Sequence, residues 1–365
     1  MTPSLRHRFR GCLLGGAVGD ALGAPVEFLR RSEILARFGP EGITRYAPAY
    51  GGLGTITDDT QMTLFTADGL IRGWVRGCIK GITTLPGVTA HAYLRWLTTQ
   101  GERPVARDFT LSDEPGWLIG QSALHHRRAP GNTCLAALRE MSWLGEPARN
   151  DSKGCGGVMR MAPVGLFAAR HGRPADPAET FGLGVELAAL THGHPTGALT
   201  AGVFATLILE LVEGIALPDA IDHAVAILSA QAAHEETARA VHAARALAAS
   251  DLPPEEAIAR LGQGWVAEEA LAIAIYCALV ATDLRHGVIL AVNHDGDSDS
   301  TGAIAGNLLG AIHGVDAIPS EWLEPLELRE VITTVADDLH DFVDWSVGTG
   351  EDDATEMVWE RYPGF

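Results

Sequence analysis

GCLLGGAVGDALG, residues 11–23, has a glycine at every fourth position, and the later stretch GAIAGNLLG, residues 302–310, repeats that spacing. A glycine inside a helix costs about 1 kcal/mol relative to alanine, so a row of them requires a compensating contact. Four-residue spacing aligns these positions along one ridge of a helix, where the missing side chains let another backbone approach closely. We therefore predict unusually tight helix packing at both stretches. The alternative is a backbone held near a ligand.

Four long segments have apolar residues at three- and four-residue spacing, typical of helices, whereas alternating runs typical of strands are scarce. These segments are residues 181–213, 218–249, 266–282 and 325–346. Stretches rich in proline and glycine predict surface loops, none resembling a linker between domains, at residues 38–54, 101–118 and 128–133. We therefore predict an all-α fold in one compact domain over residues 1–365. The final fifteen residues, including Glu351, Asp352 and Asp353, are expected to form an acidic tail.

The chain is acidic, with 27 lysine and arginine residues against 46 aspartate and glutamate residues and a formal net charge of −19. This charge repels phosphate backbones and anionic lipid surfaces, so it argues against nucleic-acid and membrane partners. A substrate that carries phosphate must then be held locally, by backbone N–H groups or by bound cations. The surplus of carboxylates also favours the capture of divalent metal ions.

Cysteines are scattered, odd in number and without a CxxC pair, at Cys12, Cys78, Cys134, Cys155 and Cys277. This pattern indicates neither a disulfide framework nor a zinc ribbon, and reduced thiols predict a cytoplasmic protein. The apolar stretch near the N-terminus is interrupted by Asp20 and Glu27, unlike that of a signal peptide. No uninterrupted apolar run approaches the roughly 18–20 residues that a membrane helix requires, so we expect no membrane span.

Two aspartates stand directly before a predicted helix in the segment Thr57-Asp58-Asp59-Thr60-Gln61. Thr57 is suited to cap that helix, and aspartates favour the positive end of a helix dipole. Capping alone can therefore explain this segment, and a metal site is the alternative interpretation.

Three aspartates fall within five residues in the segment His294-Asp295-Gly296-Asp297-Ser298-Asp299-Ser300-Thr301, which also precedes a predicted helix. A cap uses one or two acids, and three packed carboxylates repel one another unless a cation neutralises them. An EF-hand calcium loop is disfavoured because Asn307 and Leu308 stand where its glutamate is expected. Two acidic clusters at two helix starts therefore suggest one shared site.

The chemistry of these clusters favours a hard metal ion, because aspartate, serine and threonine oxygens match Mg²⁺ or Mn²⁺ better than Zn²⁺. The pair His192 and His194 is a weaker zinc candidate, since no third nitrogen or sulfur ligand is evident. The sequence has no GxxxxGKS or GxxxxGKT loop and no GxSxG elbow, which disfavours P-loop nucleotide hydrolysis and the serine hydrolases built on that elbow.

Five motifs occur in an order that resembles the ADP-ribosylglycohydrolase family, which includes ADP-ribosylarginine hydrolases and dinitrogenase reductase-activating glycohydrolases. They are GGAVGDALG (15–23) followed by Glu27, Thr57-Asp58-Asp59, KGCGGVMR (153–160), THGHP (191–195) and GDSDST (296–301). No single motif is specific, whereas five in the expected order are. The resemblance spans roughly residues 9–315 and leaves a C-terminal helix and the acidic tail in residues 316–365.

The resemblance implies an all-α fold that holds two Mg²⁺ ions, for which Mn²⁺ can substitute. The implied metal ligands are Thr57, Asp58 and Asp59 from the first cluster and Asp297, Asp299 and Ser300 from the second. Relatives often have threonine at the position of Ser300, and both side chains offer a hydroxyl oxygen. Asp295 falls outside the matched ligands and is expected to support a ligand or to lie at the surface.

By the same resemblance, a glycine-rich segment lies along ADP-ribose and offers backbone N–H groups to its diphosphate. The implied contacts are Ser152, Lys153, Gly154 and Cys155, with His192 near the ribose. Lys153 either reaches a phosphate or is simply exposed, and Cys155 either touches the substrate or is a small buried thiol. Glu27 matches a mobile segment that covers the metals.

The resemblance thus implies a magnesium-dependent hydrolase that removes mono-ADP-ribose from an ADP-ribosylated protein and releases ADP-ribose. Arginine is the favoured linkage because the His-Gly-His-Pro and Asp-Ser-Asp-Ser-Thr variants are similar to the arginine-specific branch. The candidate catalytic bases are Asp58, Asp299 and Glu27. The alternatives are a serine-linked or small-molecule conjugate, a magnesium-dependent nucleotide phosphohydrolase, and a non-catalytic ADP-ribose-binding protein.

Overall fold

The structure is a computed structural model that describes residues 3–105, 116–172, 174–348 and 353–364. Within these residues the chain forms α-helices, short 3-10 turns and two isolated β-bridges but no strand, which confirms the predicted all-α fold. The α-helices are α1 (Leu5–Gly23), α2 (Arg31–Phe38), α3 (Asp58–Lys80), α4 (Leu85–Thr99), α5 (Asn132–Glu140), α6 (Ala162–His171), α7 (Pro177–Ala189), α8 (Pro195–Glu213), α9 (Leu217–Ser229), α10 (Glu235–Ala248), α11 (Pro254–Leu261), α12 (Ala267–Val280), α13 (Leu284–Val292), α14 (Ser298–His313), α15 (Ser320–Leu323), α16 (Arg329–Asp341) and α17 (Asp353–Arg361).

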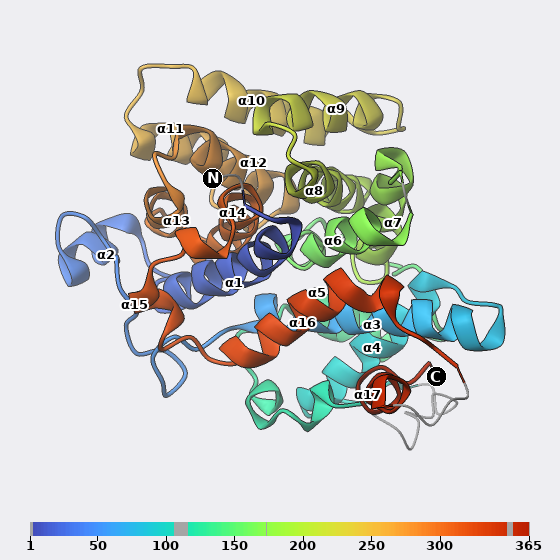
Figure 1. The fold of residues 1–365 in the computed structure, drawn as a ribbon. Helices are drawn as coiled ribbons and strands as arrows, with labels where there is room; N and C mark the ends of the chain where they lie inside the picture. The colour runs from blue at the N-terminus through green and yellow to red at the C-terminus, as the bar shows by residue number, and fades with distance from the viewer. Residues whose placement is uncertain (1–2, 106–115, 173, 349–352, 365) are drawn as a thin grey trace.

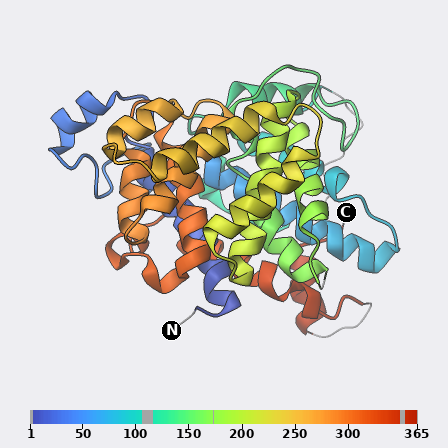
Figure 2. The same ribbon diagram turned by 90° about the horizontal axis from the view of Figure 1, so that it is seen from above.

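The helices stack in layers around a central pair, α1 and α14 (Figure 1). Helices α9 and α10 lie across the top in that view and pack against α8 and α12, while α3, α4 and α16 lie below the centre. Figure 2, seen from above, shows α9 and α10 spread over the helices beneath them. One hydrophobic core runs through these layers, so the central helices are buried on nearly every side.

The two glycine stretches pack against each other, and this contact confirms the tight packing that their spacing predicted. A Cβ atom added at Gly15 would lie 2.4 Å from the carbonyl oxygen of Gly306, and one at Gly19 would lie 1.9 Å from that of Gly302. The side chain of Asn307 adds a hydrogen bond from its Nδ2 to the carbonyl oxygen of Cys12 at 2.7 Å. Only glycine permits two helix backbones to approach this closely.

Two of the four predicted helical segments each consist of two helices. The segment 181–213 is divided between α7 and α8 by a turn, because Pro195 begins α8 and its missing N–H is tolerated only in a first helical turn. The segment 218–249 is likewise divided between α9 and α10. All five cysteines are free thiols, as predicted.

Helix α8 differs from the expectation that no segment could span a membrane. Among the described residues it is the one helix long and apolar enough to do so by length and composition, but 94% of that window is buried inside the fold. Its neighbours there are α6, α7 and α9. A core helix surrounded by other helices is expected to be apolar all round.

Part of the predicted acidic tail is helical and packs against the core. Residues 353–361 form α17, and the buried Tyr362 donates a hydrogen bond from its hydroxyl to Asp338 at 2.8 Å. Arg361 pairs with the same carboxylate at 2.9 Å. Glu351 and Asp352 lie outside the described residues. Apolar contacts of Val358 and Tyr362, which the acidic composition hides, hold this end against the core.

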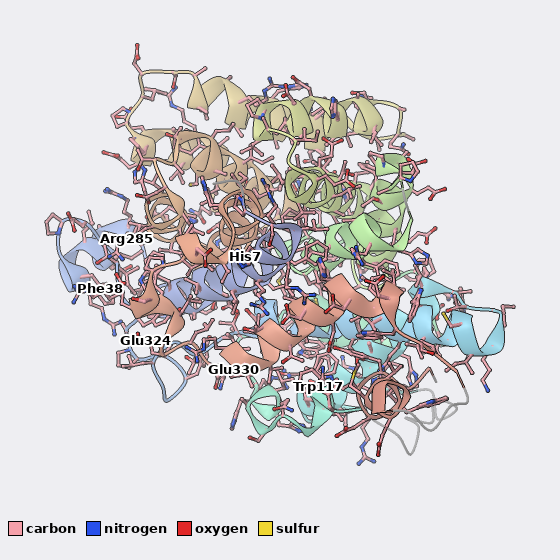
Figure 3. All side chains as sticks on the ribbon, in the orientation of Figure 1. His7, Phe38, Trp117, Arg285, Glu324 and Glu330 are labelled. Atoms are coloured by element: carbon pink, nitrogen blue, oxygen red, sulfur yellow. The ribbon has the colours of Figure 1, made fainter. Side chains whose placement is uncertain are left out.

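Side chains fill the space between the helices in Figure 3, including at the edge formed by α2, α13 and α15. Arg285, labelled there, pairs with Glu321 at 2.7 Å and lies over the ring of Trp322 at 5.0 Å from its centre. This pair joins α13 to α15.

We predict opposite effects for two glycine-to-alanine substitutions in helices. Gly15→Ala should lower the free energy of unfolding by about 1–3 kcal/mol, because the new Cβ collides with the backbone at Gly306. Gly182→Ala in α7 is the matched control: its Cβ would meet no atom within 4 Å, so the better helix propensity of alanine should stabilise the protein. Chemical denaturation measures both, and a Gly15→Ala protein as stable as the control would contradict the packing argument.

Candidate active site

The first turns of α3 and α14 meet, which brings the two acidic segments to one cavity of about 330 Å³. Thr57 caps α3 by accepting a hydrogen bond from the N–H of Asp59 at 3.3 Å. Asp297 caps α14 in the same way, accepting from the N–H of Ser300 at 3.4 Å. Each segment therefore caps its helix, and the two segments also line the same cavity.

Five carboxylates line this cavity, and all are buried: Glu27, Asp58, Asp59, Asp297 and Asp299. One oxygen from each of Glu27, Asp297 and Asp299 lies within 4.8 Å of the others. No lysine or arginine is among the residues that line the cavity in the described structure. The site is thus a dense negative cluster at the positive ends of two helix dipoles, whose partial charges offset only part of the repulsion.

Burial and mutual repulsion strongly raise the pKa values of these carboxyl groups. Burial, followed by the charge of Asp299, raises the pKa of Glu27 to about 11. The same two causes raise the pKa values of Asp58, Asp59 and Asp297 well above their usual range. A cation among these groups would reverse the shifts, because opposite charge favours the ionised form.

Two buried carboxylate oxygens in the cluster have no hydrogen-bond partner: Oε2 of Glu27 and Oδ1 of Asp59. An unpartnered buried oxygen is costly unless a ligand satisfies it. The donor set consists of carboxylates with the hydroxyl of Ser300 beside them, which suits a hard divalent cation. The residues present therefore fit a metal centre.

Asp20 is a residue of this site that the sequence interpretation missed as a functional group. From α1 it accepts hydrogen bonds from the N–H groups of Thr57 at 3.0 Å and Thr60 at 3.1 Å. Burial and the charge of Asp299 raise its pKa to about 7. Through these hydrogen bonds Asp20 holds the first turn of α3 in place. Its isolated charge within an apolar, glycine-rich stretch was the available signal.

The two remaining predicted metal ligands, Ser300 and Thr57, have different surroundings. Ser300 lines the cavity, with its hydroxyl 3.6 Å from the sulfur of Cys155. Thr57 is fully buried beside the cluster, with its hydroxyl accepting from the N–H of Asp59. Asp295 lies at the surface, where it accepts a hydrogen bond from the N–H of Arg31 at 2.6 Å, as expected for a residue outside the ligand set.

Three of the predicted substrate contacts line the cavity: Gly154, Cys155 and His192. The Cys155 thiol donates to Oδ2 of Asp297 at 2.8 Å, so it touches the acidic cluster directly. Ser152 lies to one side, 3.2 Å from the hydroxyl of Thr133, and lines a neighbouring cavity of about 520 Å³.

Lys153 turns away from the acidic cavity. Its ammonium group pairs with Glu236 at 2.6 Å and also with Glu268. A contact between this ammonium group and a phosphate would require at least one of these pairs to open. The backbone of Lys153 is held too, because its carbonyl oxygen accepts from the N–H of Ala267 at 2.8 Å.

His192 is buried and held neutral, since burial, followed by the nearby Arg160 charge, lowers its pKa to about 3. Its Nδ1 lies 2.8 Å from the hydroxyl of Thr191, which in turn accepts from Arg160 at 2.6 Å. His194 instead caps α8 by accepting from the N–H of Thr196 at 3.1 Å. His192 lines the acidic cavity whereas His194 does not, and the possible metal-binding group found among the described residues contains neither histidine.

Aromatic and loop residues at the cavity were also missed. Phe28 and Trp265 line it, as do residues 129–134, in which the N–H of Gly131 donates to Asp58 at 3.3 Å. Neither ring belongs to a periodic pattern, and only the fold brings them together.

Comparison with known proteins matches residues 1–346 to a family model described as ADP-ribosylglycohydrolase. The chain belongs to the ADP-ribosylglycohydrolase family. It is 29% identical to the ADP-ribosyl-[dinitrogen reductase] glycohydrolase of Rhodospirillum rubrum, over 90% of this chain and 92% of that protein. It is 27% identical to the ADP-ribosylarginine hydrolase Tri1 of Pseudomonas putida (strain GB-1), over 92% and 78%. The ADP-ribosylhydrolase ARH3 of Danio rerio is 26% identical, over 86% and 85%.

A solved structure described as an ADP-ribosylglycohydrolase-related protein complex matches the fold with a TM-score of 0.66. Its sequence is 28% identical, and the match covers 93% of this chain and 99% of that one. The predicted family is thereby confirmed. As an ADP-ribosylglycohydrolase, the chain is a hydrolase that acts on ADP-ribose conjugates.

We predict that the stability gained from divalent metal increases with pH. The folded-state pKa values of Asp20 and Glu27, about 7 and about 11, lie above the unfolded values of roughly 4. The metal-free folded state then binds more protons than the unfolded state, so its free energy of unfolding falls as pH rises above about 4. A divalent ion such as Mg²⁺ or Mn²⁺ is expected to bind the ionised cluster, and should then raise Tm more at pH 8 than at pH 5.

Thermal unfolding with chelator or with metal at both pH values measures this effect. The Asp297→Asn/Asp299→Asn protein is the control, because it removes two of the buried charges. An equal rise in Tm at both pH values in the natural protein would count against a cation at this cluster.

Proposed function

We propose that this ADP-ribosylglycohydrolase is a magnesium-dependent enzyme that removes mono-ADP-ribose from arginine side chains of modified proteins. The observation that carries the proposal is the buried cluster of five carboxylates in the wall of one cavity, whose lining in the described part of the chain includes no lysine or arginine. A cation stabilises the ionised form of such a cluster, and hard divalent ions are the partners that its oxygens suit. Arginine is favoured by the motif variants and by the name of the Pseudomonas putida relative.

Two ions would be held by Thr57, Asp58 and Asp59 on one side and Asp297, Asp299 and Ser300 on the other. Their charges would balance four of the five carboxylates. When bound, such ions polarise ribose hydroxyls and water and stabilise the charge that develops at the sugar. Mn²⁺ is expected to substitute for Mg²⁺.

The chain's own residues orient the rest of the substrate. Gly154 and Cys155 line the cavity, and the diphosphate is expected to lie along the Ser152–Cys155 segment. The N–H of Gly154 donates to Oγ of Ser152 at 3.4 Å and that of Cys155 donates to the carbonyl oxygen of Trp265 at 3.2 Å, so a phosphate oxygen would have to share or replace these bonds. His192 is kept neutral, so its ring can share a hydrogen bond with a ribose hydroxyl without adding charge. Both features reduce the freedom of the bound sugar.

In the hydrolytic step, water attacks C1″ as the C1″–N bond breaks. The bond's electron pair goes to the arginine nitrogen, and the proton lost by the water passes to a carboxylate. Asp58, Asp299 and Glu27 are the candidate bases. Burial and neighbouring charge raise the pKa of Glu27 to about 11, so Glu27 would hold a proton near neutral pH when no cation is bound.

Three other functions would give different outcomes in the same assay. A serine-linked or small-molecule conjugate would release the same ADP-ribose from another partner, whereas a nucleotide phosphohydrolase would release phosphate. A non-catalytic ADP-ribose-binding protein would bind tightly without turnover. Incubation with arginine-linked and serine-linked peptides, with and without Mg²⁺, followed by product analysis, separates all four.

We predict that Asp297→Ala and Asp299→Ala each lower kcat/KM on the arginine-linked peptide by about a hundredfold or more, with little loss of fold. Asp295→Ala is the matched control, because its carboxylate comes from the same segment but lies at the surface on the N–H of Arg31. It should retain activity near that of the natural protein. Steady-state kinetics with circular dichroism tests this, and full activity in Asp299→Ala would refute the ligand assignment.

A further inference from the structure

Two exposed aromatic rings stack on each other at the wall of the acidic cavity. Phe28 is 69% exposed and Trp265 is 39% exposed, and both line the cavity. Their ring centres are 5.7 Å apart with an angle of 17° between the planes. Exposed rings of this size are unusual next to a polar site, and a pair of them suggests contact with a ligand.

The two rings come from segments that already serve the site. Phe28 directly follows Glu27, whose carboxylate lies within 4.8 Å of those of Asp297 and Asp299. The carbonyl oxygen of Trp265 accepts a hydrogen bond from the N–H of Cys155 at 3.2 Å. Trp265 is thus anchored to the Ser152–Cys155 segment, and Phe28 extends over it with its other face open to solvent.

The charge beside the rings selects the kind of ligand. Five carboxylates line the cavity, no lysine or arginine joins them in the described structure, and the ammonium group of Lys153 is held elsewhere by two glutamates. Two divalent ions would balance four of these carboxylates and leave one negative charge, so the remaining field favours a cation. A planar cation also stacks on an aromatic face, and the guanidinium group does so better than an ammonium group.

We infer that Phe28 and Trp265 form the platform that recognises the guanidinium group of ADP-ribosylated arginine, an inference that rests on the proposed function. The reacting C1″ must lie at the carboxylates, and the side chain attached to it leaves the cavity past the residue that follows Glu27. The open face of Phe28 stacks on the guanidinium group, and Trp265 supports Phe28 from behind. A serine linkage offers no planar cation, so the platform discriminates between the two linkages.

Adenine is the other planar group of the substrate, but it is separated from C1″ by the diphosphate and two riboses. The rings beside Glu27 therefore face the leaving arginine side chain rather than the adenine. The two possibilities differ in free ADP-ribose, which contains adenine but no guanidinium group.

Kinetics on arginine-linked and serine-linked peptides of otherwise identical sequence tests the inference. We expect Phe28→Ala and Phe28→Leu to lower kcat/KM for the arginine linkage by about 3- to 30-fold, with little change for the serine linkage. Phe28→Tyr should leave kcat/KM near that of the natural protein, because it keeps the ring. Trp265→Ala should act in the same direction. Ile82→Ala, an exposed apolar residue outside the cavity, is the control.

Calorimetry with chelated metal gives a second readout that needs no turnover. We expect the arginine-linked peptide to bind more tightly than free ADP-ribose, and Phe28→Ala to remove only that difference. Equal losses on both linkages, or an equal loss of free ADP-ribose affinity, would overturn the inference and assign the rings to adenine or to structure. Absence of turnover on either peptide would refute the proposed hydrolase function, and the calorimetric comparison would still decide the role of the rings.

Discussion

The contact between α1 and α14 is the constraint on which the rest of the site depends. The glycines of each helix face the backbone of the other, so the two helices lie at a separation that any side chain would prevent. This contact carries the end of α1 to the first turn of α14, where a Cβ at Gly23 would collide with Ser298 and Asp299. The residues that follow α1 are thereby delivered to the acidic cluster, and Asp20 reaches the start of α3.

The cavity contains an excess of negative charge, and the rest of the fold must offset its cost in folding free energy. Its carboxylates are desolvated and repel one another, which destabilises the metal-free protein. The large apolar core around them offsets this cost. Nearby arginines make other contacts. Arg160 donates to the hydroxyl of Thr191, which also contacts His192. Arg72 and Arg95 both pair with Asp68 in the core. Because these cations lie outside the cavity, its negative charge remains available to a bound cation.

Much of this arrangement could be predicted from local pattern. Helical periodicity predicted the all-α class, and the acids at two helix starts predicted a shared site, because caps and carboxylates are encoded within a few adjacent residues. Other features depend on distant partners. Lys153 was a candidate phosphate contact, yet glutamates from α10 and α12 hold it. The tail is acidic in sequence, and no local pattern indicates that Tyr362 is buried on Asp338.

The sequence by itself determined the helical class, the family, the glycine stripes and the acids available for a metal. Each of these is a property of short segments, whose spacing fixes what a helix presents on one face. Only the tertiary structure decided that the two stripes pack on each other, that Asp20 supports the start of α3, and that Phe28 meets Trp265. These contacts join residues tens to hundreds of positions apart, and no local spacing encodes which surfaces meet when the core is buried.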